Sequence, residues 1–355
     1  PNLAAFLDLV ALGTVADVVP LDHNNRILVN HGLTRMRSGK LCSGLSSLLA
    51  AAGRDIQRLS AFDLSFVLGP RLNAAGRLSD MAIGIECLLA DDPGRALSLA
   101  RKLDDLNRER REIEADMQEQ AIVLLEAIDA DASPPGVALF DEQWHQGVVG
   151  ILASRLRERI HRPVFAFARG GQGEIKGSGR SIPGLHLRDA LDLMSKRDPD
   201  LLLRFGGHAA AAGVTVREAD FPRFRDLFAE IAAEWLTPEE LSHRVVTDGS
   251  LETGWCTLDS ARQISGQSWG QGFPPPLFLD EFVVEQERLL KDKHLKLRLA
   301  RQGRKFEAIW FNHADSLPSP ARLAYRLDVN RYQGIESVQL VIEHGSDAAS
   351  PLTAK

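Results

Sequence analysis

Different hydrophobic patterns follow one another along the chain, and each predicts a different kind of element. Residues 7–21 form an apolar run, LDLVALGTVADVVPL, in which we expect a buried strand, or a helix leading into one, that ends near Asp17. From about 95 to 128, apolar residues recur at three- and four-residue steps among charges, which predicts one long helix; Arg110 interrupts this stripe. Beyond about 243, short alternating segments separated by turns predict a small β-barrel.

The segment between the long helix and the barrel has an α/β pattern. VALFD and RPVFAFA are short apolar strands, and an amphipathic helix, GVVGILASRLRERI, lies between them. Such a β-α-β unit is expected to be parallel and right-handed. We therefore predict an α/β multi-domain protein. Its parts are the end of an α/β domain over 1–58, a helical connector over 59–133, an α/β domain over 134–237, a barrel over 243–346 and a tail over 347–355.

Composition narrows the class of protein. The formal net charge is −6, so nucleic acid would have to be bound by local basic patches rather than by a global field. Three scattered cysteines without a CxxC motif suit a reducing cytoplasm, and no apolar run reaches the ~20 residues of a membrane span. The chain starts at Pro1 within structured sequence, so we expect an N-terminal part outside it. The long helix holds too few heptads for a coiled coil, which favours a monomer.

Asp17 is the first candidate for chemistry. A carboxylate at the carboxyl end of a buried strand would be costly unless it is paired or binds a metal. Mn²⁺ and Mg²⁺ require several oxygen or imidazole ligands, and the adjacent Asp22-His23 pair lies in a polar loop. Asp17 is therefore either a structural cap or one ligand of a larger set.

Two further segments could bind phosphate. GPRLNAAGR brings Arg71, Asn73 and Arg77 together after a Gly-Pro pair, and KGSGRS supplies Ser178, Gly179 and Arg180. Arginine suits bidentate phosphate contacts, and glycine lets the backbone approach an anion. The alternatives are a solvated helix-end turn for the first segment and an ordinary glycine-rich hairpin for the second. Neither segment is a P-loop or a G-x-G-x-x-G motif.

Two histidines are further candidates, and one of them, His208, lies among small residues. In FGGHAAAAG, Gly206, Gly207 and His208 mark a place where the backbone comes close to a ligand or to another segment. His145 precedes a helix N-terminus, which is a natural position for an anion. Each histidine could equally be structural. HExxH and G-x-S-x-G motifs are absent, which disfavours a self-contained zinc site and a serine hydrolase.

The predicted barrel carries a basic strand. In KHLKLRL, alternation places His294, Lys296 and Arg298 on one face and the leucines on the other, with Lys293 just before them. Trp310, Phe311 and Tyr325 follow in the sequence. A basic face with aromatic residues on a small barrel is typical of single-strand binding, and a plain solvated face is the alternative.

Six segments, in this order, closely resemble the RecJ family of the DHH phosphoesterase superfamily: LDLVALGTVADVVPL, GPRLNAAGRL, HQGVVGILASRL, KGSGRSIPGLHLRDAL, FGGHAAAAG and KHLKLRL. The resemblance covers about residues 1 to 346. It implies a DHH domain ending near residue 58, a long connecting helix, a DHHA1 domain and an OB-fold. The implied activity is 5′→3′ hydrolysis of single-stranded DNA in recombination and repair.

The resemblance also implies site residues. Two Mn²⁺ or Mg²⁺ ions would act in the complete enzyme, and Asp17 matches the last metal ligand of the family. The Asp-x-Asp and Asp-His-His motifs of the family's DHH domain have no match within residues 1–58, so this chain alone is expected to be inactive. Ser178 and Arg180 match the pocket for the 5′-phosphate, together with either Arg71 or Arg77. The implied partners are single-stranded DNA with a 5′ end, a single-strand-binding protein and a RecQ-type helicase.

Two other hypotheses stay open. Another DHH-DHHA1 phosphodiesterase acting on short oligonucleotides is one, although such an enzyme would not need a strand-guiding barrel. A non-catalytic module that binds single strands is the other, because most metal ligands are absent from this sequence.

Overall fold

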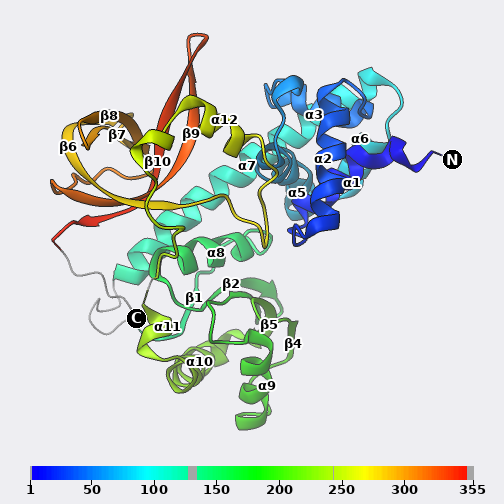
Figure 1. Cartoon of the computed structure of the whole chain (residues 1–355). Coiled ribbons are helices and arrows are strands. Elements are labelled where there is room, and N and C mark those ends of the chain that lie inside the picture. Colours follow the sequence, from blue (N-terminus) through cyan, green and yellow to red (C-terminus); the bar gives the residue numbers. More distant parts are fainter. Residues whose placement is uncertain (1, 127–133, 243, 350–355) are drawn as a thin grey trace. The chain divides into compact units, whose positions relative to one another are not determined.

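The computed structural model describes residues 2–126, 134–242 and 244–349, and these residues divide into two compact units (Figure 1). One unit combines residues 1–69 with 244–355, and the other comprises residues 70–243. Within the described residues, no helix has both the length and the apolar character needed to cross a membrane.

Residues 2–69 fold as helices and turns, and no strand occurs among them. The strand expected within residues 7–21 is therefore wrong. Helix α1 (Leu7–Ala16) occupies this run, because its buried residues, Ala11, Leu12 and Val15, recur with helical rather than alternating spacing. A side chain at Gly32 would meet the Leu7 carbonyl at 2.3 Å, so glycine allows the close contact between α1 and α2 (His23–Arg37). The later helices of this segment are α3 (Ser43–Ala51), α4 (Ala61–Asp63) and a π-helical turn (Leu64–Leu68).

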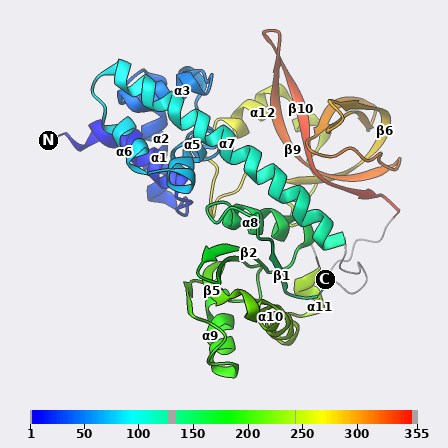
Figure 2. The same cartoon turned by 180° about the vertical axis from the view of Figure 1, so that it is seen from behind.

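The polar stretch after the Gly-Pro pair is also helical. Proline is tolerated in the first turn of a helix, so Pro70 does not stop α5 (Gly69–Leu78). Short α6 (Ala82–Leu89) leads into α7 (Pro93–Glu126), which is the predicted long helix (Figure 2). The end of that prediction, at 127–128, lies outside the described residues.

The second unit contains a five-stranded sheet with the order β1-β2-β3-β5-β4. Strands β1 and β2 are parallel and flank α8, which confirms the predicted β-α-β unit. The bounds are β1 (Val137–Phe140), α8 (Val149–Ile160), β2 (Val164–Gly171), β3 (Glu174–Arg180), α9 (Leu187–Arg197), β4 (Arg204–Gly207), β5 (Ala211–Arg217), α10 (Phe221–Trp235) and α11 (Pro238–Leu241).

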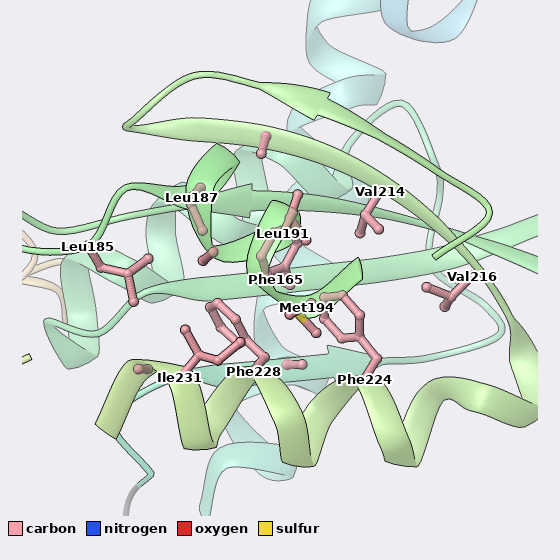
Figure 3. Close-up of a cluster of buried hydrophobic side chains, with 14 of the residues drawn as sticks. Phe165, Leu185, Leu187, Leu191, Met194, Val214, Val216, Phe224, Phe228 and Ile231 are labelled. Atoms are coloured by element: carbon pink, nitrogen blue, oxygen red, sulfur yellow. The ribbon is translucent and has the colours of Figure 1, made fainter. Parts of the chain in front are cut away.

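Two apolar layers cover opposite faces of this sheet. Phe165 points toward α10, where Phe224 and Phe228 meet its ring edge-on (Figure 3). Phe167 belongs to the same core and also meets Phe224 edge-on. Ala166 and its neighbours face α8 and the C-terminal half of α7 instead. Alternation along β2 therefore separates the two cores.

The C-terminal region forms the predicted barrel, which closes in the order β10-β8-β7-β6-β9. Its elements are α12 (Leu258–Ser265), β6 (Phe278–Leu290), β7 (His294–Arg301), β8 (Arg304–Trp310), β9 (Ala321–Tyr332) and β10 (Ile335–Asp347). The predicted tail begins too early, because Asp347 still pairs with Ala321 in the ladder between β10 and β9. Residues 350–355 lie outside the described part of the chain.

Candidate nucleic-acid interface

The N-terminus of α8 is the centre of the candidate site. The His145 carbonyl accepts the amides of Val148 and Val149, at 2.9 and 3.2 Å, and this turn starts the helix. His145 itself is exposed, and its Nδ1 accepts the Gly147 amide at 3.1 Å. The structure thus places His145 just before a helix N-terminus, where free amides favour an anion.

Strand β3 presents its polar side chains to this helix. Ser178 and Arg180 lie on the face toward α8, and a methyl group at Gly150 would stand 3.2 Å from both Ser178 Oγ and Arg180 Nη2. Glycine at this position therefore leaves room beside the serine hydroxyl and the guanidinium. On the opposite face, a side chain at Gly179 would come within 2.5 Å of the Phe165 ring, so core packing alone explains that glycine. A part for Gly179 in substrate binding stays a prediction.

Arg77 reaches the same place from α5. Its Nη1 donates to the Gly147 carbonyl at 3.1 Å, in the turn before α8. Burial lowers the pKa of Arg77, and the charge of Glu114 opposes that shift. Burial also lowers the pKa of Arg180, and the charges of Arg77 and Arg157 add to the effect. Both guanidiniums stay protonated, so an anion between them would relieve their desolvation and their mutual repulsion.

The other two polar residues of α5 point elsewhere. Arg71 Nε and Nη2 both lie 2.8 Å from Asp104 Oδ1 on α7, so its guanidinium is held by a carboxylate. Asn73 is exposed on α5. The sequence left the choice between Arg71 and Arg77 open; the geometry favours Arg77 as the partner of Arg180.

Gly206 on β4 and Ser178 on β3 lie in one line across the sheet, on either side of β5. Gly213 pairs with both residues, and a side chain at Gly206 would meet nothing within 4 Å. Gly207 adopts a φ of 144°, which favours glycine, and His208 is exposed, with its Nδ1 accepting the Ala210 amide at 3.3 Å. A shallow hollow of about 310 Å³ adjoins this row, and its polar lining side chains are Lys176, Arg204 and Thr215.

Asp17 differs from the sequence-based expectation. It is the exposed C-cap residue of α1, and not the end of a buried strand. The buried acid of this run is Asp8, whose carboxylate accepts the Cys42 amide at 2.8 Å and the Leu9 amide at 2.9 Å. Among the described residues, no three His, Cys, Asp or Glu side chains come together as a metal-binding group. Asp17 therefore does not form a metal site with them.

The basic face of the barrel follows the prediction. The leucines of β7 are buried, whereas Lys296 and Arg298 are exposed and His294 is partly exposed. Glu307 on β8 lies 3.4 Å from Lys296 Nζ and 3.2 Å from Arg298 Nε, so it offsets part of their charge. Lys293 lies in the exposed turn before the strand.

The aromatic residues near this strand divide into two groups. Phe311 is 51% exposed, and its ring meets that of His294 edge-on, with the centroids 5.4 Å apart. Tyr325 was expected near the basic face, but it is fully buried in the barrel, and its hydroxyl donates to Asp280 Oδ2 at 2.8 Å. Trp310 is partly buried and stacks on His313. Phe311 is thus the aromatic side chain available to a ligand on this face.

Sequence reasoning missed the glycines that shape the pocket. A methyl group at Gly147 would lie 2.3 Å from the Arg77 carbonyl, so only glycine lets α5 approach this turn. Gly150 likewise leaves room for Arg180. The two glycines of HQGVVG could be seen in the sequence. The residues that approach them in space, Arg77 and Arg180, are distant in the sequence, so the role of the glycines could not be inferred.

Comparison with known proteins accounts for this architecture. Residues 133–234 match the DHHA1 domain, and residues 247–344 match the RecJ OB domain. The chain thus contains one segment similar to DHHA1 domains and one similar to RecJ OB domains. It is 52% identical to the single-stranded-DNA-specific exonuclease RecJ of Dickeya dadantii, over 97% of this chain and 62% of that protein. It is 49% identical to RecJ of Escherichia coli, over 97% of this chain and 61% of that protein.

Solved structures give the same result. The chain superimposes on RecJ from Thermus thermophilus in complex with Mg²⁺ with a TM-score of 0.83 and 34% identity, covering 99% of this chain and 53% of that one. A Mn²⁺ complex of the same protein matches with a TM-score of 0.83, covering 99% and 51% of the two chains. The resemblance to RecJ is thus confirmed, and the RecJ-like chain spans about three fifths of the length of these curated relatives.

Proposed function

We propose that the whole protein is a 5′→3′ exonuclease that acts on single-stranded DNA and releases 5′-mononucleotides during recombination and repair. The observation that carries this proposal is the convergence of Arg77, Ser178 and Arg180 at the N-terminus of α8. The relatives named as single-stranded-DNA-specific exonucleases support the reaction class.

The pocket at α8 suits the phosphate at a 5′ end. A terminal phosphate monoester carries more charge than an internal diester and offers three oxygens to surrounding donors. Two desolvated guanidiniums, a serine hydroxyl and helix amides would bind it more tightly than a 5′-hydroxyl end. Binding the terminal phosphate would fix the distance to the first internucleotide bond, which explains the release of mononucleotides.

The barrel would hold the rest of the strand. Lys296 and Arg298 supply positive charge, and Phe311 supplies a stacking surface beside His294. This arrangement fits unpaired bases, which expose both faces of their rings. Lys176 and Arg204, beside the glycine row of the DHHA1 domain, would add backbone contacts.

Divalent metal ions would supply the activated water and stabilise the departing oxygen. We propose two ions, Mn²⁺ or Mg²⁺, with Asp17 as one carboxylate ligand. The described residues do not complete such a site, so we assign to this chain substrate binding rather than hydrolysis. A single-strand-binding protein and a RecQ-type helicase as partners, a monomeric state and a cytoplasmic location stay predictions.

The test compares this chain with a version extended upstream by about one catalytic-domain half. Both receive a 5′-phosphorylated single strand and Mn²⁺, and mononucleotide release is followed. We expect release by the extended protein only. If neither protein releases nucleotides while both bind the strand, the protein is a non-catalytic module that binds single strands. Release of mononucleotides by both proteins would refute the argument that the described residues do not complete the metal site.

A further inference from the structure

A buried polar cluster on α7 lies beneath the candidate phosphate pocket. Arg110, which interrupts the apolar stripe of this helix, is only 8% exposed, and its neighbours Asn107 and Glu114 are 4% and 9% exposed. Burying charged groups costs free energy unless they are well paired, and apolar residues would stabilise such a position at least as well. The cluster therefore calls for an explanation other than stability.

Glu114 is the centre of this cluster. Its Oε2 accepts Arg110 Nη1 at 2.6 Å, and its Oε1 accepts Arg155 Nε of α8 at 3.1 Å. Arg110 Nη2 donates to Asn107 Oδ1 at 3.2 Å, while Arg110 Nε is buried without a hydrogen-bond partner. Oε1 of Glu114 thus connects α7 to the helix whose N-terminus forms the pocket, while Oε2 holds Arg110 within α7.

The charge of Glu114 also reaches the pocket itself. It opposes the shift that burial causes in the pKa of Arg77, and it does the same at Arg110. At Arg155 burial acts to lower the pKa, but the hydrogen bonds and charges of Glu114 and Glu158 together outweigh it and raise the pKa. Arg77 in turn repels both Arg110 and Arg180. The carboxylate of Glu114 therefore stabilises the charged forms of Arg77, Arg110 and Arg155, of which Arg77 and Arg110 repel each other.

We propose that Glu114 is a built-in counter-anion of the arginine cluster, a positioning residue that sets the affinity of the neighbouring pocket for phosphate. In the empty pocket, its carboxylate offsets the repulsion among the guanidiniums and holds Arg110 and Arg155 in place. When a phosphate binds, the like charge of Glu114 opposes it. The affinity is therefore lower than the arginines alone would give, which would favour release of a 5′-mononucleotide. This inference rests on the proposed function of the pocket.

The test measures binding of inorganic phosphate to this chain by calorimetry and by the rise in Tm. Glu114→Gln is expected to lower Tm without ligand and to tighten phosphate binding about threefold to tenfold, the effect of one charge over roughly 10 Å in a partly buried medium. Glu114→Asp keeps the charge and should bind within about twofold of the parent. The matched control is Glu158→Gln, which removes an exposed carboxylate from Arg155 and Arg157 on α8 and should leave phosphate affinity unchanged.

A double variant covers the case in which Glu114→Gln does not fold. Arg110→Met with Glu114→Gln removes the buried pair and leaves the total charge unaltered, and such replacements are often neutral for stability. We expect the phosphate affinity of the double variant to lie within about twofold of the parent. If Glu114 had only a structural role, the double variant would instead lose most of its phosphate affinity. If Glu114→Gln binds phosphate as weakly as the unmodified chain or more weakly, the inference about Glu114 is wrong, although the phosphate pocket itself is not refuted. Failure of the unmodified chain to bind phosphate would instead refute the proposed pocket.

Discussion

Replacing Arg77 and Arg71 separately tests whether α5 contributes one specific arginine to the pocket. Arg77→Gln removes a guanidinium that lies beside Gly147 and repels Arg180. A hydrogen bond to a charged group contributes about 1.5–3 kcal/mol, so we expect about 10- to 150-fold weaker binding of a 5′-phosphorylated strand. Binding of the same strand with a 5′-hydroxyl should change little, because it lacks the terminal charge.

Arg71→Gln is the matched variant on the same helix. It removes the contact with Asp104, which is 25% exposed and also lies 3.5 Å from Arg108, so we expect a loss of stability below about 2 kcal/mol. The preference for a 5′-phosphate should be retained. The affinity of each variant for the 5′-phosphorylated and the 5′-hydroxyl strand is measured by fluorescence anisotropy. The ratio of the two affinities gives the preference of that variant for a 5′-phosphate, and its Tm shows that it is folded. Loss of the preference in Arg71→Gln and its retention in Arg77→Gln would refute the assignment.

Three other variants test the fold and the barrel. Asp280→Asn should destabilise the barrel by about 3–5 kcal/mol in urea unfolding, because the buried Asp280 carboxylate, 2.7 Å from Arg301 Nη2, is lost and the Arg301 side chain, only 13% exposed, keeps no counter-charge there. Gly179→Ala should cost about 1–3 kcal/mol in the same assay, because the new methyl group would meet the Phe165 ring at 2.5 Å. Lys296→Gln with Arg298→Gln should reduce the salt dependence of single-strand binding, by about one unit of slope for each DNA phosphate that the protein no longer neutralises.

Each of these variants has a control elsewhere on the protein's surface or on the same strand or sheet. Glu281→Gln removes a 57% exposed carboxylate next to Asp280 and should change stability by less than about 1 kcal/mol. Gly213→Ala places its methyl group 4.0 Å from the nearest atom and should cost less than Gly179→Ala. Arg225→Gln, on α10, should leave the salt slope unchanged. A variant that behaves like its control would contradict the corresponding argument.

Periodic segments could be predicted from the sequence, and a uniformly apolar segment could not. Alternation in HLKLRL places the leucines inside the barrel because strand side chains point to opposite faces in turn. The spacing over 95–128 likewise predicts a long helix, found as α7. The run over 7–21 has no such period, so strand and helix were not distinguishable there, and only packing between α1 and α2 decided the outcome.

The sequence by itself determined which residue types were available for binding: arginines near small residues, a serine in a glycine-rich strand, and basic residues on one strand face. Only the tertiary structure decided which of them meet. Arg77 and Arg180 are about 100 residues apart, and Glu114 reaches Arg155 across a separation of 41 residues. The physical reason is that charges and hydrogen bonds act over a few ångströms in space, whereas a sequence pattern records only neighbours along a helix or a strand.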